Sequence, residues 1–398
     1  MLLEPAVRPP ELLADLSNLI ILTAQTGDEW QSTCDLVAQH ALPVFREYRC
    51  RTVEVARAGP RRADGIVVLQ DSREPIRMHP DPEESGYYAL SREGRDNGVM
   101  PVLSSRACSS KAKGWPLDYW RDRELGSRPY IHAVGFNAEE GRRIVRDTAV
   151  TLGGRRCPIY PLHVAGWNRQ RCSDYLYGLF GVRWPKSCCR QCCFVSAVSG
   201  WPDQLARFRA APRESYRHVV DEFVTVALNR NSPLFGRAGT LADRLARGNA
   251  NLVLALADRD MAAAEWALYR VRRLYYGRAQ AVRSLHIACR GTRLQMDDAL
   301  QSVAAALGIQ PLTEAGHTRL WLARRPDSEQ YPHWEEFLVA APATARPKDG
   351  RSFETQWHTR VPRDAVHLGL AAGDILAALG SSARDEQLSP VPMVLTAS

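Results

Sequence analysis

The residues best suited to chemistry are cysteines crowded into one short segment. The chain holds ten cysteines, and four of them fall within six consecutive positions, namely Cys188, Cys189, Cys192 and Cys193. The C-x-x-C spacing of Cys189 and Cys192 lets two thiolates reach one metal ion or cluster, and it also occurs in redox pairs. In a large intracellular chain, clustered thiols are more typical of metal binding than of disulfide bonds. We therefore expect the chemistry to centre on Cys189 and Cys192.

Two upstream segments carry residue types that suit an anionic ligand. The pattern Cys-x4-Lys-x2-Pro-Leu starts at Cys108 and places its lysine at position 113. A second segment ends in Glu140 and is followed by Arg143. Lys113 and Arg143 could bind phosphate or sulfate through charge-assisted hydrogen bonds. Each of these cations taken alone is equally typical of a solvated surface charge.

The elements that must position these residues begin with a buried strand. Residues 19–23 form a continuous apolar run, a helix is expected at residues 29–48, and residues 51–56 have the pattern of a second strand. Strand, helix and strand in this order predict a βαβ unit with a parallel sheet. The segment Thr26-Gly-Asp-Glu29 follows the first strand, so Glu29 could position ribose hydroxyls, Mg²⁺ or a helix N-terminus, as could Glu140. Isolated acids are more often ordinary surface residues.

The rest of the chain predicts two domains and a tail. Residues 60–100 are rich in Pro, Gly, Arg and Asp, which indicates a long irregular insertion in a first domain that covers residues 1–250. Residues 251–383 are expected to form a smaller α+β domain, and residues 384–398 a disordered tail. The further expected strands are residues 129–134, 266–274, 284–289, 317–323 and 335–340. The further helices are residues 138–148, 168–180 and 295–307, and residues 158–162 lead into the second of these.

Taken together and in this order, the motifs resemble the phosphoadenosine phosphosulfate (PAPS) reductase family of the adenine nucleotide α-hydrolase-like, or PP-loop, superfamily. The resemblance covers roughly residues 15 to 235. It implies a doubly wound parallel sheet that binds ATP or a sulfonucleotide, with Mg²⁺ as a further cofactor, at the carboxyl ends of the strands. The residues that it assigns to the nucleotide are Thr26, Gly27, Glu29, Lys113, Glu140 and Arg143. The residues that could hold an iron–sulfur cluster or zinc are Cys108, Cys172, Cys189 and Cys192.

Two departures from the family pattern bear on this expectation. The family opens with a strand and a Ser-Gly-Gly-x-Asp-Ser loop that cradles phosphates, and nothing before Leu19 matches it. We therefore expect the sheet to lack its first strand, with the chain beginning inside the helix that follows the loop. The second departure is Cys193, which stands where relatives commonly carry proline.

The resemblance implies two reaction classes, and no residue can be assigned as catalytic. One class cleaves ATP between its α- and β-phosphates and often delivers sulfur to a nucleic acid. The other cleaves a sulfonucleotide reductively with a thiol close to the C-terminus, and this chain has no cysteine after Cys289. The alternative is a degenerate, non-catalytic module that binds nucleic acid or protein and retains only the metal site.

Composition limits the partners. The net charge of +8 comes mostly from arginine, which fits contact with phosphates or nucleic acid and fits a GC-rich genome equally well. No apolar run reaches the roughly 18 residues that span a bilayer, and residues 1–10 lack the features of a secretory signal. The sequence therefore predicts a cytoplasmic protein with no membrane partner, and it leaves the oligomeric state open.

Overall fold

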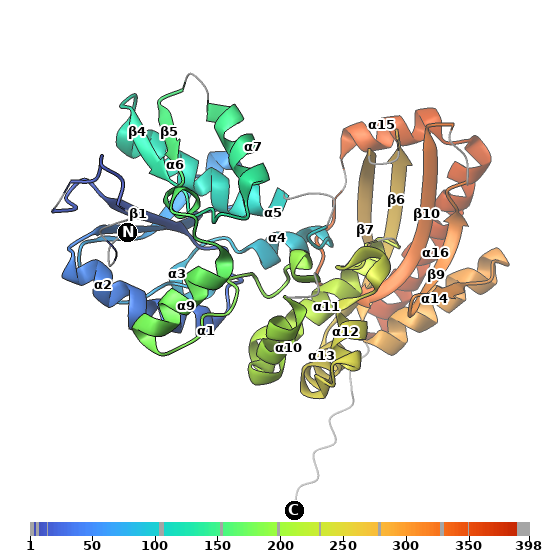
Figure 1. The fold of residues 1–398 in the computed structure, drawn as a ribbon. Coiled ribbons are helices and arrows are strands. Elements are labelled where there is room, and N and C mark those ends of the chain that lie inside the picture. The colour runs from blue at the N-terminus through green and yellow to red at the C-terminus, as the bar shows by residue number, and fades with distance from the viewer. Residues whose placement is uncertain are drawn as a thin grey trace, which may run out of the picture. The chain divides into compact units, whose positions relative to one another are not determined.

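The computed structural model describes residues 4, 8–13, 15–102, 107–151, 154–196, 200–230, 232–277, 280–326, 330–348 and 350–387. The chain divides into two compact units (Figure 1). The N-terminal unit comprises Met1–Glu93 and Pro101–Arg207, and the C-terminal unit comprises Gly94–Met100 and Phe208–Ser398. The division expected near residue 250 therefore lies instead between Arg207 and Phe208.

The first sheet of the N-terminal unit contains the predicted βαβ unit. Strand β1 (Ile20–Ala24) pairs in parallel with β2 (Arg51–Arg57), and the strand order is β1-β2-β3. The helix between β1 and β2 consists of α1 (Gln31–Leu36), the π-helical segment η2 (Val37–Ala41) and α2 (Leu42–Glu47). The predicted parallel pair and its connecting helix are thus confirmed.

The segment expected to be an irregular insertion is largely regular. Strand β3 (Ile66–Ser72) pairs antiparallel with β2. Along the chain, the short helix η3 (Arg62–Asp64) precedes it, and the helices α3 (Pro82–Ser85) and α4 (Leu90–Asn97) follow it. The expectation was wrong because the apolar run at the start of β3 is short and is flanked by residues rich in Pro and Arg. A short strand that pairs with a central neighbour needs little apolar surface of its own.

Helix α6 (Trp115–Leu125) packs its Trp120 side chain against the first sheet. Trp120 forms one buried cluster with Val53 and Val55 of β2. The same ring lies 5.4 Å from the guanidinium carbon of Arg51, which forms ion pairs with Asp71 and Glu124. This packing fixes the segment before α6, which consists of α5 (Ala107–Ser109) and η4 (Ser110–Gly114).

A second, two-stranded parallel sheet completes the N-terminal unit. Strands β4 (Tyr130–Ala133) and β5 (Arg156–Ile159) pair in parallel and are connected by α7 (Gly141–Thr151). The helices that follow are α8 (Pro161–Val164), α9 (Arg169–Phe180), η5 (Cys193–Ser196) and α10 (Trp201–Ala210). The chain is therefore a mixed α/β protein that contains parallel strand pairs.

The C-terminal unit is built on a five-stranded antiparallel sheet in the order β7-β6-β10-β9-β8. Its strands are β6 (Trp266–Tyr275), β7 (Ala281–Gly291), β8 (Leu312–Glu314), β9 (His317–Ala323) and β10 (His333–Pro342). Residues of α14 (Arg293–Leu307) and α16 (Arg363–Gln387) join Trp266 and Leu338 in one buried cluster. The predicted strands and helix of this α+β region are confirmed. Strand β9 has the predicted bounds, and the other three predicted strands are slightly longer than predicted.

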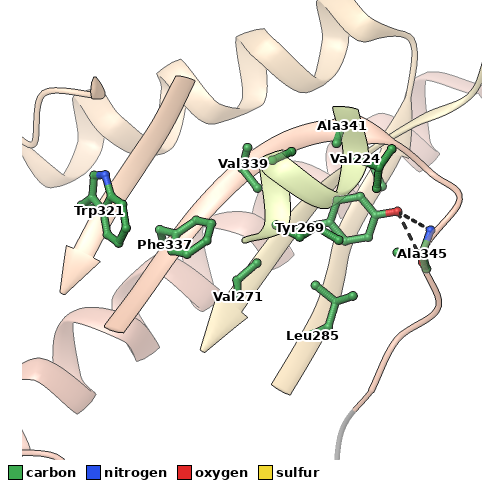
Figure 2. Packing of buried hydrophobic residues seen from close by; sticks show 12 residues of the cluster. Val224, Tyr269, Val271, Leu285, Trp321, Phe337, Val339, Ala341 and Ala345 are labelled. Carbon is green, nitrogen blue, oxygen red and sulfur yellow. Dashed lines mark hydrogen bonds between the residues drawn. The ribbon is translucent and has the colours of Figure 1, made fainter. Parts of the chain in front are cut away.

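The second core cluster of this unit explains where the division falls. Helix α11 (Pro212–Leu228) contributes Val224 and Leu228 to a buried cluster with Tyr269 and Phe337 of the sheet (Figure 2). The Tyr269 hydroxyl donates a hydrogen bond to the Ala345 carbonyl at 3.3 Å. Because α11 supplies half of a core whose other half is the antiparallel sheet, the residues from Phe208 onward belong to the C-terminal unit. The remaining helices of the unit are η6 (Gly236–Ala238), α12 (Leu241–Arg247), α13 (Asn251–Ala263) and α15 (Arg351–Arg360).

Two further expectations concern the end of the chain and the membrane. Helix α16 runs to Gln387, past the boundary expected after Ala383, and residues 388–398 lie outside the described part of the chain. Among the described residues, no helix is both long and apolar enough to cross a bilayer.

Candidate functional site

The turn after β1 is buried and requires glycine at its centre. Gly27 has a φ of +77°, and a Cβ atom there would lie 2.6 Å from the Cβ atom of Ala89. Thr26 and Asp28 are buried on either side of it. The Asp28 carboxylate accepts a hydrogen bond from the Ser91 backbone N–H at 2.7 Å. The turn is thus held from both sides, at the carboxyl end of a parallel strand, where open α/β sheets bind their ligands.

The cysteine segment is joined directly to this turn. The Thr26 hydroxyl lies 3.6 Å from the Cys189 sulfur, and the Arg190 backbone N–H donates to the Asp28 carbonyl at 2.9 Å. The Arg190 guanidinium donates to the Gly27 carbonyl at 3.0 Å. The Ser187 hydroxyl donates to the Glu29 carboxylate at 3.1 Å. The residues Thr26, Gly27 and Glu29, which the resemblance assigns to a nucleotide, therefore contact the cysteine segment.

A glutamine that the sequence analysis did not single out joins the same residues from α10. The Gln204 side chain is buried, and its Nε2 donates to the carbonyl oxygens of Cys189 at 3.3 Å and Arg190 at 3.1 Å. Its Oε1 accepts from the Trp30 indole N–H at 3.2 Å and from the Cys188 thiol at 3.1 Å. A single glutamine on a helix forms no sequence pattern, so no signal in the sequence could have found it.

The thiols are held in their neutral form by burial. Burial raises the pKa of Cys189 to about 12, and the positive charge of Lys113 acts in the opposite direction. Burial also raises the pKa of Cys188 to about 12 and raises that of Cys108, and in both cases the charge of Cys192 adds to the shift. A protonated thiol is a poor nucleophile, so these cysteines in this state are not poised for nucleophilic attack.

Two cations without a hydrogen-bonded partner lie near the thiols. The Lys113 ammonium makes no hydrogen bond or ion pair within the described residues, whereas Lys111 pairs with Glu93 at 3.0 Å. Arg207 is buried, and its three guanidinium nitrogens have no hydrogen-bond acceptor in the described part of the chain. Its positive charge lowers the pKa of Cys188 after burial has raised it. A buried cation without an acceptor favours an anion or a thiolate beside it.

Three of the predicted site residues are not brought to this site. Cys172 lies on α9, where burial raises its pKa and the nearest charges that act on it are those of Arg171 and Glu139. Glu140 and Arg143 form an ion pair with each other at the start of α7. Across the described residues, no hydrogen bond or ion pair connects any of these three to Cys189.

The thiols also do not form a closed set of metal ligands. In the part of the chain that the structure describes, no three His, Cys, Asp or Glu side chains are grouped so that they could hold a metal ion. The arrangement that the structure does provide is a buried turn, two adjacent thiols whose pKa burial raises, and two cations. No protein-family model matches the sequence, and neither a curated protein nor a solved structure is significantly similar to this chain.

Proposed function

We propose that the N-terminal unit is a PAPS reductase-like, PP-loop type scaffold that binds ATP or a sulfonucleotide beside the cysteine segment. On this proposal its parallel strands are part of a doubly wound sheet. The observation that carries the proposal is the contact between Thr26 and Cys189, which unites two motifs of that family at the carboxyl end of β1. The unit would then act in nucleotide activation, sulfur transfer or reduction.

Lys113 is the residue best suited to bind the anionic part of the nucleotide. It has no hydrogen-bond or ion-pair partner among the described residues, and its positive charge lowers the pKa of Cys189. An ammonium group in this position favours phosphate or sulfate near the thiol. Glu29 lies on the same turn, and its carboxylate could position ribose hydroxyls or Mg²⁺. Glu140 and Arg143 pair with each other, and they could bind the nucleotide only if its binding brought them closer to this turn.

Ligand-induced stabilisation tests the nucleotide site. The melting temperature would be measured with ATP, AMP, adenosine phosphosulfate and PAPS, each with and without Mg²⁺. A ligand at one hundred times its Kd should stabilise the protein by about 2.7 kcal/mol. Lys113→Ala should remove this effect, while Lys111→Ala, which changes a neighbouring lysine already paired with Glu93, should keep it. Equal stabilisation of both variants would contradict the assignment of Lys113.

We also propose that Cys108, Cys189 and Cys192 bind an iron–sulfur cluster or zinc, with a fourth thiol. Cys172 is the fourth ligand predicted from the sequence. Cys188 is the alternative, because it precedes Cys189 directly and the charge of Cys192 raises its pKa, as it does that of Cys108. The present side-chain arrangement does not fit a metal, because no three such groups converge within the described residues. Metal binding would therefore require the thiols to turn toward one another.

Metal analysis after anaerobic purification tests this second proposal. Iron, acid-labile sulfide and zinc would be measured for the wild type and for Cys192→Ser. Cys157→Ser is the matched control because Cys157 is exposed on β5. Comparison of Cys172→Ser with Cys188→Ser identifies the fourth ligand. Absence of both metals from freshly prepared wild-type protein would rule out the metal site.

A second candidate function is a non-catalytic module that binds nucleic acid or protein. The raised pKa values of Cys188 and Cys189 favour it, because neutral buried thiols suit a structural role better than nucleophilic catalysis. Such a module would retain the metal, which the thiols bind only after losing their protons, without responding to nucleotides. Metal in the protein, with no nucleotide-induced change in melting temperature, would select this candidate over the first.

A further inference from the structure

The N-terminal unit contains a cavity of about 470 Å³ that shares no residue with the cysteine segment. It lies among η3, α6 and the first residues of β4 and β5. Four arginines line it, namely Arg62, Arg121, Arg155 and Arg156. A volume of this size is within the range of about 300 to 1,000 Å³ found for small-ligand sites, so one nucleotide fits it.

Most of these arginines are already paired, which identifies the groups still able to bind a ligand. Arg121 pairs with Asp118 and Arg155 with Asp122, two aspartates that also line the cavity. Arg156 pairs with Asp147 at 2.7 Å. The exposed Arg62 makes no side-chain hydrogen bond or ion pair within the described chain.

Arg121, another arginine of the cavity wall, is largely buried. The Nε atom of Arg121 has no acceptor among the described residues, although the side chain is largely shielded from water. Burial lowers the pKa of Arg121, which reflects the cost of holding its charge away from solvent. Arg62 is therefore the cavity donor that an anion could reach, whereas the Nε atom of Arg121 is covered by the protein itself.

Aromatic side chains form the rest of the cavity wall. Two guanidinium groups lie over the Tyr130 ring, that of Arg121 at 5.7 Å and that of Arg155 at 5.9 Å from the ring centroid. Trp115 and Tyr119 meet edge to face with 5.9 Å between their ring centroids. Aromatic rings next to arginines provide stacking surfaces for an unpaired base, because every base has a flat π-face.

We propose that this arginine–aromatic pocket binds one nucleotide of a single-stranded nucleic acid, with its phosphate at Arg62 and its base against Tyr119 and Trp115. The net charge of +8 fits a polyanion, and a free mononucleotide, which has the same chemistry, is distinguished from it by a binding measurement with AMP. A duplex is disfavoured because its bases are stacked and unavailable. The pocket is separate from the nucleotide site proposed at Thr26 and Lys113, so either can fail alone.

Binding of a fluorescein-labelled dodecathymidylate, followed by fluorescence anisotropy across a range of salt concentrations, tests the pocket. Tyr119→Leu should weaken binding about tenfold through lost stacking. Arg62→Ala should lower the slope of log K against log salt by about 0.7, the value for one phosphate contact on a single strand. Arg183→Ala is the matched control, since it removes another exposed arginine, which pairs with Asp174 elsewhere in the unit.

The outcomes separate this inference from its rivals. Weaker binding in Arg62→Ala and Tyr119→Leu, with unchanged binding in Arg183→Ala and Lys113→Ala, supports the pocket. Binding of AMP but not of the oligonucleotide, lost in the same two variants, overturns the assignment to a nucleic-acid strand. Equal oligonucleotide binding by all variants overturns the pocket itself. If Tyr119→Leu fails to fold, Arg62→Ala still decides, because it removes an exposed side chain that has no described partner.

Discussion

The Thr26 hydroxyl lies 3.6 Å from the sulfur of Cys189, although 163 positions separate the two residues. This contact makes the turn after β1 and the cysteine segment a single structure. Gln204 holds the segment from the other side through the carbonyl oxygens of Cys189 and Arg190. A perturbation of the turn should therefore be detected at the thiols, and a perturbation of the thiols at the turn.

Thiol reactivity should report this environment. Burial raises the pKa of both Cys188 and Cys189 to about 12, so at pH 8 iodoacetamide should modify them roughly a hundredfold more slowly than the exposed Cys157. Lys113→Ala should slow Cys189 further, because the lysine charge lowers the pKa of this thiol. Peptide mass spectrometry gives the three rates. Modification of Cys189 as fast as that of Cys157 would contradict the burial described here.

Gln204→Leu should destabilise the N-terminal unit. The substitution leaves the buried Trp30 indole N–H and the part-buried carbonyl oxygens of Cys189 and Arg190 without this partner, at a cost of roughly 2 to 4 kcal/mol. Urea unfolding followed by tryptophan fluorescence measures the change. Gln170→Leu is the control, because Gln170 is exposed and, within the described part of the chain, its side chain hydrogen-bonds Asp174 alone. Similar losses of stability in both variants would indicate a general effect of losing glutamine.

Glu222 in α11 should make the stability of the C-terminal unit depend on pH. Its buried carboxylate accepts the backbone N–H groups of Leu234 and Leu241, yet burial outweighs these bonds and raises its pKa to about 7. Between about pH 4.5 and pH 7 the folded state retains a proton that the unfolded state has lost. The free energy of unfolding should therefore fall by up to about 3 kcal/mol as the pH rises through this range.

The variant Glu222→Gln isolates this contribution. The difference between its unfolding free energy and that of the wild type should change between pH 4.5 and pH 7 and level off outside that range. Contributions from the other titrating groups of the unit, such as His317, whose pKa burial lowers to about 4, cancel in the difference. A difference that stays constant with pH would show that Glu222 does not titrate in the folded state.

Arg319→Leu should disrupt the end of α11. The fully buried guanidinium donates to the Val226 carbonyl and, at 3.2 Å, to the Ala227 carbonyl, so it satisfies acceptors in the last turn of the helix. We expect a loss of roughly 2 to 4 kcal/mol by urea unfolding. Arg324→Leu should change stability by less than about 0.5 kcal/mol, since that side chain is half exposed and pairs with Glu314. Comparable losses would show that the buried bonds of Arg319 add little.

The elements that could be predicted were those with a continuous or strictly periodic apolar pattern. The strand β9 was predicted with its observed bounds, and α14 was predicted to within two residues of its start, where Thr292 and Gln295 form a capping box. β3 was missed because only pairing with β2 makes its short run a strand. The boundary between the units was misplaced because α11 owes its burial to a sheet that lies later in the sequence.

The candidate site divides in the same way. Cys189, Lys113 and the turn at Thr26 have recognisable spacing. Thr26 contacts Cys189 directly, and the positive charge of Lys113 lowers the pKa of Cys189. Gln204 and Arg207 have no pattern, because their roles depend on what surrounds them after folding. Cys172 matched the expected residue type, but its position on α9 is set by helix packing that spacing alone cannot specify.

The segment Gly94–Met100 belongs to the C-terminal unit although the chain on both sides of it belongs to the other unit. Within that unit, Arg95 binds Asp221 at 2.9 Å, and the Gly98 carbonyl accepts from Asn229 at 2.7 Å. Gly98 also packs so closely on Leu228 that a Cβ atom would lie 2.5 Å from it. During synthesis this segment leaves the ribosome long before its partners exist, so the C-terminal unit cannot finish folding as a separate downstream module. A gene truncated after Arg207 would leave these seven residues without the surface they cover.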